Sequence, residues 1–512
     1  MNKFRRFLVP SLAGLIFSAA AWAQGISGTW VFSVPGPDGT SRDTYFRLKE
    51  NGGKITGIVQ QAYNIRTIDD GGAAEGNHVK FSTTYTGRGQ SITITYEGDL
   101  TGTELHLKSS GGGRGPGGGR GRGPSEIVAV RTTEGAGLPP ARIDPPSLHD
   151  VRPNGLARTP PMGWNSWNHF KGQIDDAGVR SIADAMVSSG MKDAGYLYVN
   201  IDDTWQAGRD SAGNITTNKR FPDMKSLADY VHSKGLKIGL YSSPGPKTCA
   251  GYEGSYGHEV QDAKQYAAWG FDYLKYDWCS ASAVYQDSDM HAVYQKMGDA
   301  LAASGRAIVF SLCQYGRANV QEWGPSVSGN LWRTTGDIND SWTSMSTIGF
   351  SQSALAPFAA PGHWNDPDML EIGNGGMTAT EYRTHMSLWS MLAAPLLAGN
   401  DIRTMNDETK EILLNKDVIA IDQDKAGHQA HRAAQNGDTE TWTRELADGS
   451  IAVALFNKGD SEATMKAAWT NYGIKRAKTV RDLWAHKELS GAAEGYTVEV
   501  PSHGVVLLRV SK

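Results

Sequence analysis

Charged side chains recur in the middle of this 512-residue chain, each time directly after a short β-prone run. They are Asp202, Asp203, Lys275, Asp277, Arg333, Asp337, Asp366 and Asp368. Hydrolysis of a glycosidic bond needs two carboxyl groups, one that attacks or stabilises the sugar carbon and one that protonates the leaving oxygen. Because several acids follow successive predicted strands, with Lys and Arg beside them, glycoside hydrolysis is a candidate reaction for this chain.

Tryptophan is concentrated in the same region. Ten of the 15 tryptophans lie between Trp164 and Trp389, and several of them flank the acids. The apolar faces of a sugar stack on aromatic rings, while its hydroxyls hydrogen-bond to carboxylate, amide and guanidinium groups. Most of these tryptophans taken singly would be core residues, but beside the acids they favour a carbohydrate ligand.

A metal site is the main alternative for these acids. Asp202 and Asp203 could bind Ca²⁺ or Mg²⁺, but a hard cation takes six or more oxygens and no loop has dedicated spacing. His169, His258 and His363 lack the pairing of a zinc site. A single Asp at a strand end could merely cap the next helix. Helix capping is a weaker explanation when polar residues follow several strands of the same barrel. We therefore predict no metal and no cofactor.

The elements that would position these residues alternate between helix and strand from Thr159 to about Asp424. Three segments with apolar residues at helical spacing stop at a glycine and are followed by a β-rich run, at Tyr196–Ile201, Lys237–Tyr241 and Tyr273–Tyr276. This repeat indicates parallel βα units. Eight strand ends within this stretch favour a closed (β/α)₈ barrel, whose active face lies at the carboxyl ends of its strands.

Alternating apolar and polar residues flank this barrel on both sides. Residues 24–134 predict an antiparallel β barrel or sandwich, and residues 425–512 predict a C-terminal antiparallel β-sandwich. Residues 135–158 are rich in proline and resemble a linker. The glycine-rich run Gly111–Gly123 contains three arginines but no interleaved aromatics, so a solvated loop is favoured over an RNA-binding tract.

The composition and the first residues bear on the compartment. The 50 Lys and Arg against 54 Asp and Glu, a net charge of −4, argue against a nucleic-acid partner. A basic start is followed by the apolar run Phe7–Ala20 and by Ala21-Trp22-Ala23, which is typical of a signal peptide cut after Ala23. The run is short for an uncleaved anchor, the alternative, so we expect a secreted or periplasmic protein without a membrane span.

Five motifs in order resemble those of glycoside hydrolase family 27, the α-galactosidases (melibiases) and α-N-acetylgalactosaminidases. They are Thr159-Pro-Pro-Met-Gly-Trp-Asn-Ser-Trp167, Ile201-Asp-Asp-Thr-Trp205, Tyr273-Leu-Lys-Tyr-Asp-Trp-Cys279, Trp332-Arg-Thr-Thr-Gly-Asp-Ile338 and Trp364-Asn-Asp-Pro-Asp-Met-Leu370. The resemblance covers about Thr159 to Lys512 and implies a role for each matching residue.

The resemblance implies Asp277 as nucleophile and Asp337 as acid/base. It implies that Trp167 forms a wall of the sugar pocket and that five residues bind sugar hydroxyls: Asp202, Asp203, Lys275, Arg333 and Asp368. Lys275 lies two residues from Asp277 on one strand, so we expect it to help keep that carboxylate ionised.

The chain departs from the family's pattern in places. Gln314 stands where many relatives have Glu at the sugar 2-position, Tyr315 replaces a common Trp, and Ser243 stands where Asp is usual. By the family's pattern, we expect a disulfide between Cys249 and Cys279 beside the pocket. Cys313 would then be a buried free thiol, the alternative being three reduced cysteines.

These expectations favour a secreted retaining α-galactosidase that releases terminal α-galactose from oligosaccharides or glycoconjugates. The alternatives are an α-N-acetylgalactosaminidase, a β-L-arabinopyranosidase and a non-catalytic sugar-binding barrel. The family's use of the Asp202 and Asp203 pair favours a hexose, and the length of Gln314 predicts at least roughly 100-fold preference for α-galactosides over α-N-acetylgalactosaminides. The N-terminal domain's role, as sugar-binding module, partner-binding module or stalk, stays open, as does the oligomeric state.

Overall fold

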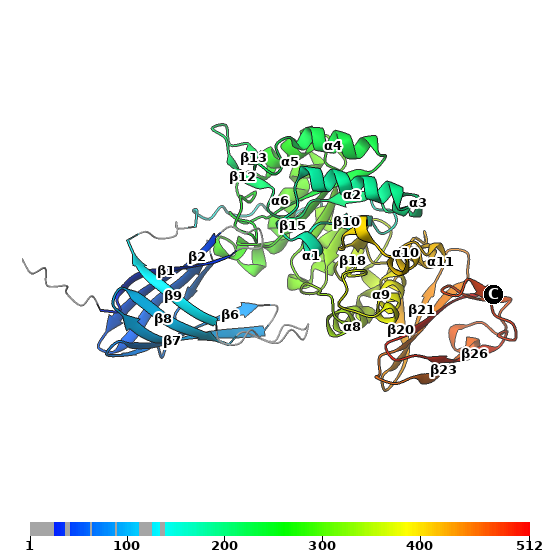
Figure 1. Ribbon diagram of the computed structural model, residues 1–512. Helices are drawn as coiled ribbons and strands as arrows, with labels where there is room; N and C mark the ends of the chain where they lie inside the picture. Colours follow the sequence, from blue (N-terminus) through cyan, green and yellow to red (C-terminus); the bar gives the residue numbers. More distant parts are fainter. Residues whose placement is uncertain (1–24, 36–40, 62–63, 88–89, 112–124, 134–138) are drawn as a thin grey trace, which may run out of the picture.

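The computed structural model describes residues 25–35, 41–61, 64–87, 90–111, 125–133 and 139–512. The predicted signal peptide, nearly all of the glycine-rich run Gly111–Gly123 and the first residues of the predicted linker lie outside the described residues. Figure 1 shows three folded parts in sequence order, an N-terminal β domain, a central α/β domain and a C-terminal β domain.

The N-terminal part is an antiparallel sheet that closes on itself. Its strands follow the order β2-β1-β9-β8-β7-β6-β5-β3-β4, and the additional pairing of β2 with β3 turns the sheet into a barrel. Trp30, Phe46, Phe81 and Tyr96 fill its interior. The strands are β1 (Gly28–Pro35), β2 (Ser41–Asn51), β3 (Lys54–Gln61), β4 (Asn64–Thr67), β5 (Ala73–Glu75), β6 (His78–Gly87), β7 (Gln90–Thr101), β8 (Glu104–Ser110) and β9 (Ser125–Thr132).

The central part is the predicted barrel of parallel strands. The strands run in the order β18-β17-β16-β15-β14-β11-β10-β19, and a parallel bridge between Leu370 and Ala398 closes the ring. Parallel pairing around a full circle confirms the (β/α)₈ prediction. The strands are β10 (Met162–Asn165), β11 (Tyr198–Asn200), β14 (Lys237–Ser242), β15 (Tyr273–Asp277), β16 (Val309–Cys313), β17 (Leu331–Arg333), β18 (Trp364–Asp366) and β19 (Leu396–Ala398).

Helices cover the outside of this barrel. The predicted glycine stops are in place: Gly190, Gly235 and Gly270 have φ of 87°, 70° and 92°, the left-handed region that suits glycine. A hairpin of β12 (Gln206–Arg209) and β13 (Ile215–Thr217), which the sequence did not indicate, follows β11. The helices are α1 (Trp167–Phe170), α2 (Asp176–Ser188), α3 (Met191–Ala194), α4 (Met224–Ser233), α5 (Glu259–Trp269), α6 (Met290–Ala302), α7 (Val320–Trp323), α8 (Trp342–Phe350), α9 (Ala379–Met391), α10 (Asp407–Leu413) and α11 (Lys416–Asp422).

The C-terminal part consists of two antiparallel sheets around one apolar core. The larger sheet has the order β20-β21-β22-β27-β24-β25, and the smaller one pairs β23 with β26. Val453, Leu455, Trp469 and Leu508 lie in the core between them, which confirms the predicted sandwich. The strands are β20 (His431–Asn436), β21 (Thr439–Glu445), β22 (Ile451–Asn457), β23 (Ala463–Ala468), β24 (Thr479–Asp482), β25 (Lys487–Glu488), β26 (Gly495–Val500) and β27 (Val505–Ser511).

The segment 139–158 has no helix or strand, yet it is bound along the barrel. Arg142 donates to Asp289 at 2.7 Å, His149 lies 3.0 Å from Asp299, and Asn154 donates to the carbonyl of Ile308 at 3.1 Å. The proline-rich segment therefore runs as a strap along the outside of the barrel, from the start of α6 to the start of β16.

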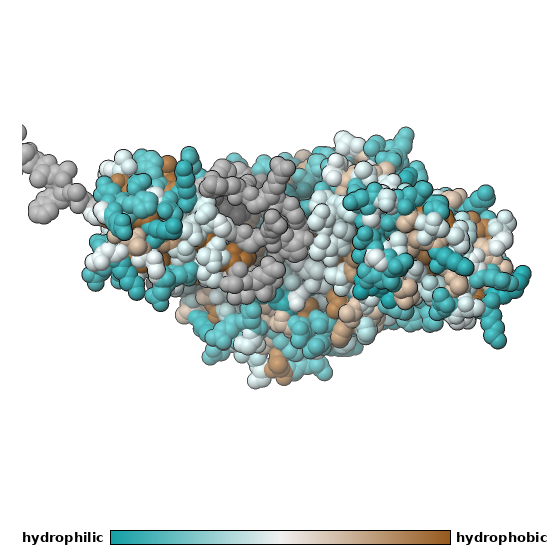
Figure 2. Space-filling model, turned by 90° about the horizontal axis from the view of Figure 1, so that it is seen from below, coloured by the Kyte–Doolittle hydropathy of each residue, from teal (hydrophilic) through white to brown (hydrophobic). Residues whose placement is uncertain are grey.

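Within the described residues, no helix has the length and apolar character that a membrane crossing requires. The face seen in Figure 2 is largely hydrophilic, with hydrophobic residues scattered in small groups.

Candidate active site

A pocket of about 230 Å³ lies at the carboxyl ends of the parallel strands. It holds eight of the nine residues predicted to be catalytic or sugar-binding. Because these strands end at the same rim of the barrel, residues 200 positions apart in sequence meet there. The lining residues are Trp167, Asn168, Lys171, Asp202, Asp203, Tyr241, Cys249, Lys275, Asp277, Tyr315, Arg333, Asp337, Ile338, Asp368 and Met369.

Asp277, the last residue of β15, is 5% exposed and is held by two tyrosines. The Tyr315 hydroxyl donates to Asp277 Oδ1 at 2.7 Å, and the Tyr241 hydroxyl donates to Oδ2 at 3.1 Å. Burial raises the pKa of Asp277 to about 6, against the opposing effects of the Lys275 charge and the Tyr315 hydrogen bond. Asp277 is therefore a buried carboxylate with both oxygens anchored.

Lys275 projects from the same face of β15 as Asp277, but its ammonium group contacts a different acid, Asp202. Its Nζ lies 2.8 Å from Asp202 Oδ2, which also accepts a hydrogen bond from Asn165 at 2.9 Å. The expectation that Lys275 favours the ionised form of Asp277 holds in direction, because its charge lowers the pKa of Asp277. Burial has the larger effect, so the net shift of the pKa of Asp277 is upward.

Asp203 ties two loops together. Its Oδ2 accepts a hydrogen bond from the Ala250 N–H at 2.6 Å, and its Oδ1 accepts one from the Thr204 N–H at 2.7 Å. Burial raises the pKa of Asp203 to about 7. Asp203 thus fixes the loop after β14, which carries Cys249, against the end of β11, while also lining the pocket.

Arg333, at the end of β17, bridges two carboxylates. Its Nη2 lies 3.1 Å from Asp337 Oδ1 and 3.0 Å from Asp368 Oδ2. Asp368 is buried and also accepts a hydrogen bond from the Ile338 N–H at 2.9 Å. The Asp337 side chain is 57% exposed, so of the two acids it is the one that can exchange protons with water.

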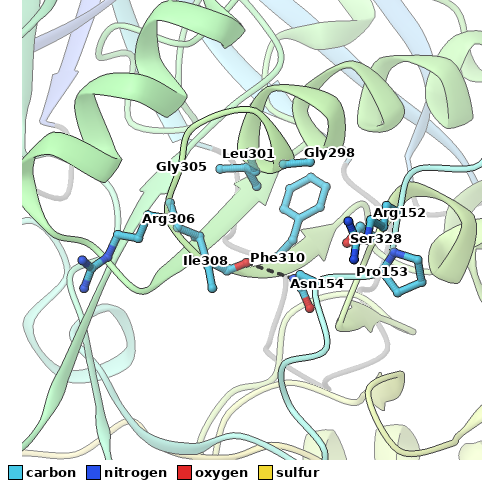
Figure 3. A pocket seen from close by; sticks show the side chains of 12 residues that line it. Arg152, Pro153, Asn154, Gly298, Leu301, Gly305, Arg306, Ile308, Phe310 and Ser328 are labelled. Carbon is cyan, nitrogen blue, oxygen red and sulfur yellow. Dashed lines mark hydrogen bonds between the residues drawn. The ribbon is translucent and has the colours of Figure 1, made fainter.

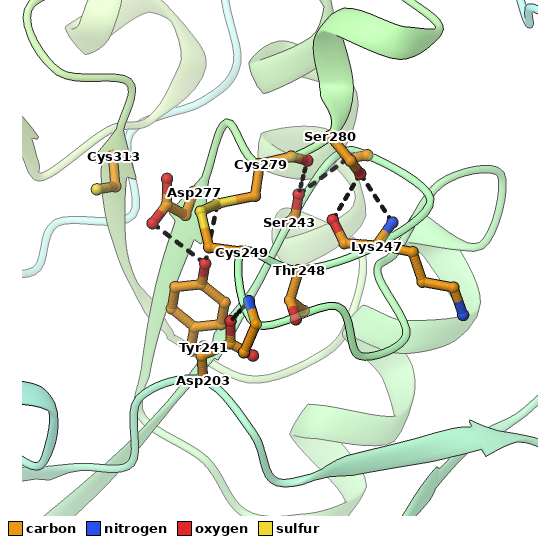
Figure 4. The surroundings of a disulfide bond; sticks show 12 residues. Asp203, Tyr241, Ser243, Lys247, Thr248, Cys249, Asp277, Cys279, Ser280 and Cys313 are labelled. Carbon is orange, nitrogen blue, oxygen red and sulfur yellow. Dashed lines mark hydrogen bonds between the residues drawn. A yellow bond between two sulfur atoms is a disulfide. The ribbon is translucent and has the colours of Figure 1, made fainter. Parts of the chain in front are cut away.

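A disulfide joins Cys249 to Cys279 beside Asp277 (Figure 4). The Cα atoms are 4.9 Å apart, and the bridge links the loops that follow β14 and β15. Cys313 is a buried free thiol 3.6 Å from Arg333 Nη1. The structure therefore contains the cysteine pairing expected from the family's pattern.

Of the nine residues predicted to be catalytic or sugar-binding, Gln314 is the one that does not line the pocket. It is fully buried, and neither of its amide atoms has a hydrogen-bond partner among the described residues. Tyr315, which the sequence marked only as a departure from the family, occupies this side of the pocket instead. Beyond a strand end, the direction of a side chain depends on the local turn, so alternation could not have distinguished these neighbours.

Two other residues flagged by the sequence have structural contacts. Asp366 is 6% exposed and accepts a hydrogen bond from the Asp368 N–H at 2.9 Å, and it does not line the pocket. Ser243 donates to the Cys279 carbonyl at 2.6 Å and so braces the loop that holds the disulfide. Tyr241 was missed, although its place at the end of a predicted strand was a usable signal.

One group of side chains in the described part of the chain is close enough to share a metal ion: Cys249, Asp277 and Cys279. Both sulfurs belong to the disulfide, and only a thiolate is a strong metal ligand. The group is therefore not a metal site in this oxidised form.

A second cavity of about 300 Å³ lies at the opposite end of the barrel, where the chain enters β16 (Figure 3). It is lined by the strap residues Arg152, Pro153 and Asn154 together with polar and apolar residues of α6 and the start of β16. It contains no carboxylate, so it offers no acid–base pair for hydrolysis.

Two family models match this chain. Residues 159–424 match the model described as alpha galactosidase A, and residues 436–510 match the one described as the alpha galactosidase C-terminal beta sandwich domain. The curated α-galactosidase of Cyamopsis tetragonoloba is 50% identical over 356 residues, which are 68% of this chain and 85% of that protein.

Solved structures extend the similarity to the fold. The α-galactosidase I of Mortierella vinacea aligns with a TM-score of 0.66 at 38% identity, over 70% of this chain and 98% of that one. A candidate α-galactosidase of Bacteroides fragilis NCTC 9343 aligns with a TM-score of 0.67 at 33% identity and covers 95% of each chain. The latter match is long enough to include the N-terminal barrel.

Proposed function

The chain belongs to the alpha galactosidase A family, and from that premise we propose that it is an exported α-galactosidase that works by double displacement with retention. Its substrate is a glycan or glycoconjugate with a terminal α-linked galactose. The observation that carries the mechanism is the contrast between the pocket's two acids: Asp277 is buried and anchored at both oxygens, whereas Asp337 is exposed and bound to Arg333.

In the first step Asp277 attacks the anomeric carbon and forms a covalent glycosyl ester, while the bond to the leaving oxygen breaks. Asp337 gives its proton to that oxygen, so the aglycone departs as an alcohol. The anchoring of Asp277 by two hydroxyls supports this role, because a fixed nucleophile loses little freedom on the way to the transition state.

In the second step Asp337, now a carboxylate, takes a proton from water as the water attacks the anomeric carbon. The ester bond to Asp277 breaks, and galactose leaves with its original configuration. Arg333 lies 3.1 Å from Asp337 and stabilises the charge that Asp337 carries between the two steps.

Asp202, Lys275 and Asp368 supply the polar groups that would hold the sugar hydroxyls. They line the same pocket as the two acids and Trp167, and their charges are paired before substrate arrives. Such pre-organised partners cost little reorganisation when hydroxyls replace water.

The proposal is tested by following hydrolysis of an aryl α-galactoside by NMR, beside the matching α-N-acetylgalactosaminide and β-L-arabinopyranoside. We expect α-galactose as the first-formed product and the highest kcat/KM on the galactoside. Asp277→Ala should lose several orders of magnitude in kcat. β-Galactose as the first product would exclude double displacement. A higher kcat/KM on either of the other two glycosides would show that the corresponding sugar, and not galactose, is the preferred substrate.

Export is proposed on two observations. Residues 1–23 have the charge, apolar run and small residues of a signal peptide, and the Cys249–Cys279 disulfide suits an oxidising compartment. Expression of the full chain should give an extracytoplasmic protein whose N-terminal residue is Gln24. An intact Met1 in the active protein would contradict cleavage.

A further inference from the structure

The carboxylate of Asp277 is held from two sides, by one hydroxyl from strand β14 and one from the turn after strand β16. Tyr241, in β14, donates to Oδ2 at 3.1 Å, and Tyr315, just beyond β16, donates to Oδ1 at 2.7 Å. Rotation of the carboxylate about its Cβ–Cγ bond would break both hydrogen bonds. The pair therefore fixes the plane of this group.

Tyr315 reaches this position through a turn with an unusual backbone. Strand β16 ends at Cys313, which pairs in register with Asp277, and Tyr315 follows with φ of 63°, in the left-handed region that is unfavourable for a residue with a side chain. The Gly316 N–H donates to the Arg333 carbonyl at 3.0 Å, and a Cβ on Gly316 would lie 2.1 Å from the Thr334 carbonyl oxygen. Surrounding contacts therefore hold this turn and aim the tyrosine ring into the pocket.

The two tyrosine hydroxyls both lie near the disulfide sulfurs, but the two residues differ in exposure. Tyr241 is 1% exposed, and its hydroxyl lies 3.2 Å from Cys279 Sγ. Tyr315 is half-buried, and the Arg333 guanidinium lies 5.8 Å from its ring centre. Tyr315 is thus the more accessible of the two donors.

We propose that Tyr315 is a positioning residue for the nucleophile, acting through the hydrogen bond from its hydroxyl to Asp277. The proposal rests on the proposed function, since it takes Asp277 as the group that attacks. It adds a role for a residue that the sequence could mark only as a departure from the family's pattern.

Loss of the Tyr315 hydroxyl should change the pH dependence of activity in a predictable direction. A donor that hydrogen-bonds the ionised carboxylate lowers its pKa, so its removal raises the pKa of Asp277 beyond the value of about 6 that burial produces. The other charged or titratable groups that act on Asp277 stay in place, namely Lys275, which lowers its pKa, Asp202 and Asp337, which raise it, and the neighbouring Tyr241 and Cys313.

The test is Tyr315→Phe, which keeps the ring as a wall of the pocket and removes only the hydroxyl. We expect kcat to fall by roughly 10- to 100-fold, because a mobile carboxylate meets the anomeric carbon less often in line. KM and the inhibition constant of galactose should stay within about threefold, and the acid limb of kcat/KM should move up by about one pH unit. Tyr230→Phe is the matched control: it removes a tyrosine hydroxyl that donates to Asp184 at 2.8 Å, far from the pocket, and should retain the wild-type profile.

Several results would overturn the proposal. An unchanged kcat and acid limb in Tyr315→Phe would show that the hydroxyl does not position Asp277. A rise in the galactose inhibition constant in proportion to the lost kcat/KM would show that Tyr315 acts on the sugar instead. Tyr315→Met also lacks a donor and must show the same displacement of the acid limb, so the test stands if the Phe variant folds poorly.

Failure of the proposed function has a different signature. The wild-type enzyme would then be inactive on aryl α-galactosides, or a slow-turnover fluorinated galactosyl donor would not label Asp277. Either result would contradict the assignment of Asp277 as the nucleophile of an α-galactosidase. An active, labelled wild type with an unaffected Tyr315→Phe would overturn only the positioning role.

Discussion

Lys275 Nζ lies 2.8 Å from Asp202 Oδ2 at the end of another strand, although Lys275 and Asp277 project from the same face of β15. The ammonium therefore makes its close contact with a proposed sugar-binding acid, and it acts on the proposed nucleophile only through its charge. Asp277 takes its hydrogen bonds from tyrosines instead. This division lets one lysine hold Asp202 in place while still opposing the protonation of Asp277.

Lys275→Met should impair both activity and stability. The Lys275 charge lowers the pKa of Asp277, so its loss should move the acid limb of kcat/KM to higher pH. The variant also leaves the buried Asp202 without its cationic partner, which typically costs about 3–5 kcal/mol of folding free energy. Steady-state kinetics between pH 4 and 8 and thermal unfolding measure the two effects.

The double variant Lys275→Met/Asp202→Asn separates them. It removes both charges, so it should recover much of the lost stability while remaining inactive. If the single Lys275→Met variant is as stable as the wild type, the ion pair with Lys275 is not needed to keep the Asp202 carboxylate buried in the folded protein.

Asp337→Ala should show a strong dependence on the leaving group. An aryl galactoside whose phenol leaves without a proton should keep partial activity in the glycosylation step, whereas one with a basic leaving group should lose about 10³-fold or more. Added azide should restore turnover of the activated substrate, because azide attacks the anomeric carbon of the glycosyl-enzyme without help from a general base. The ester bond to Asp277 then breaks, and the product is α-galactosyl azide, which NMR detects.

The control for this variant is Asp407→Ala, which removes a fully exposed carboxylate far from the pocket. It should behave like the wild type on every substrate. Equal losses in Asp337→Ala on good and poor leaving groups would argue that Asp337 is not the proton donor.

Asp277→Asn should raise stability while abolishing turnover. Burial raises the pKa of Asp277 from 3.8 to about 6, so the folded state binds this proton more tightly than the unfolded state. Ionised Asp277 therefore destabilises the fold, fully above about pH 6 and not at all below about pH 4, by an amount of order 3 kcal/mol. The amide avoids this cost and can still exchange hydrogen bonds with both tyrosines.

The measurement is the difference in unfolding temperature between Asp277→Asn and the wild type at pH 4 and pH 8. The stabilisation should be present at pH 8 and vanish at pH 4. A variant that is less stable than the wild type at pH 8 would show that the carboxylate's hydrogen bonds outweigh its burial.

The disulfide should contribute to both the pocket and the fold. The half-cystines are 30 residues apart, a loop for which a cross-link stabilises by about 3–4 kcal/mol in the chain-entropy model. Cys249→Ser/Cys279→Ser should therefore unfold at lower temperature. It should also lose kcat, because Cys279 Sγ lies 3.2 Å from the Tyr241 hydroxyl that holds Asp277.

Thiol counting checks the pairing directly. Of the three cysteines, only Cys313 should react in denaturant without reductant, and all three after reduction. The folded protein should show no reactive thiol, because Cys313 is fully buried. Three reactive thiols before reduction would exclude the disulfide.

Much of the barrel could be read from local sequence signals. Helical spacing of apolar residues, glycine stops and β-rich runs are each set by a few neighbouring residues, and together they predicted parallel βα units. Once the barrel is predicted, its strands must end at one rim, so Asp202, Asp277 and Asp337 could be assigned to one pocket before any contact was known.

Other features depend on partners distant in sequence. The N-terminal strands fit either a barrel or a sandwich, and only the pairing of β2 with β3 decides for the barrel. The partner of Lys275 is likewise set by where Asp202 lies in space, because a flexible lysine reaches any acid within its length.

The contrast between Gln314 and Tyr315 has the clearest physical reason. Both follow β16, and the sequence alone favours neither for the pocket. The left-handed backbone at Tyr315, held by the Gly316 contact with Arg333 from the next strand, sends the tyrosine into the pocket and leaves Gln314 buried. The residue types and their order determined which chemistry is available, and the tertiary contacts decided which side chain stands beside Asp277, since a turn takes its conformation from what packs against it.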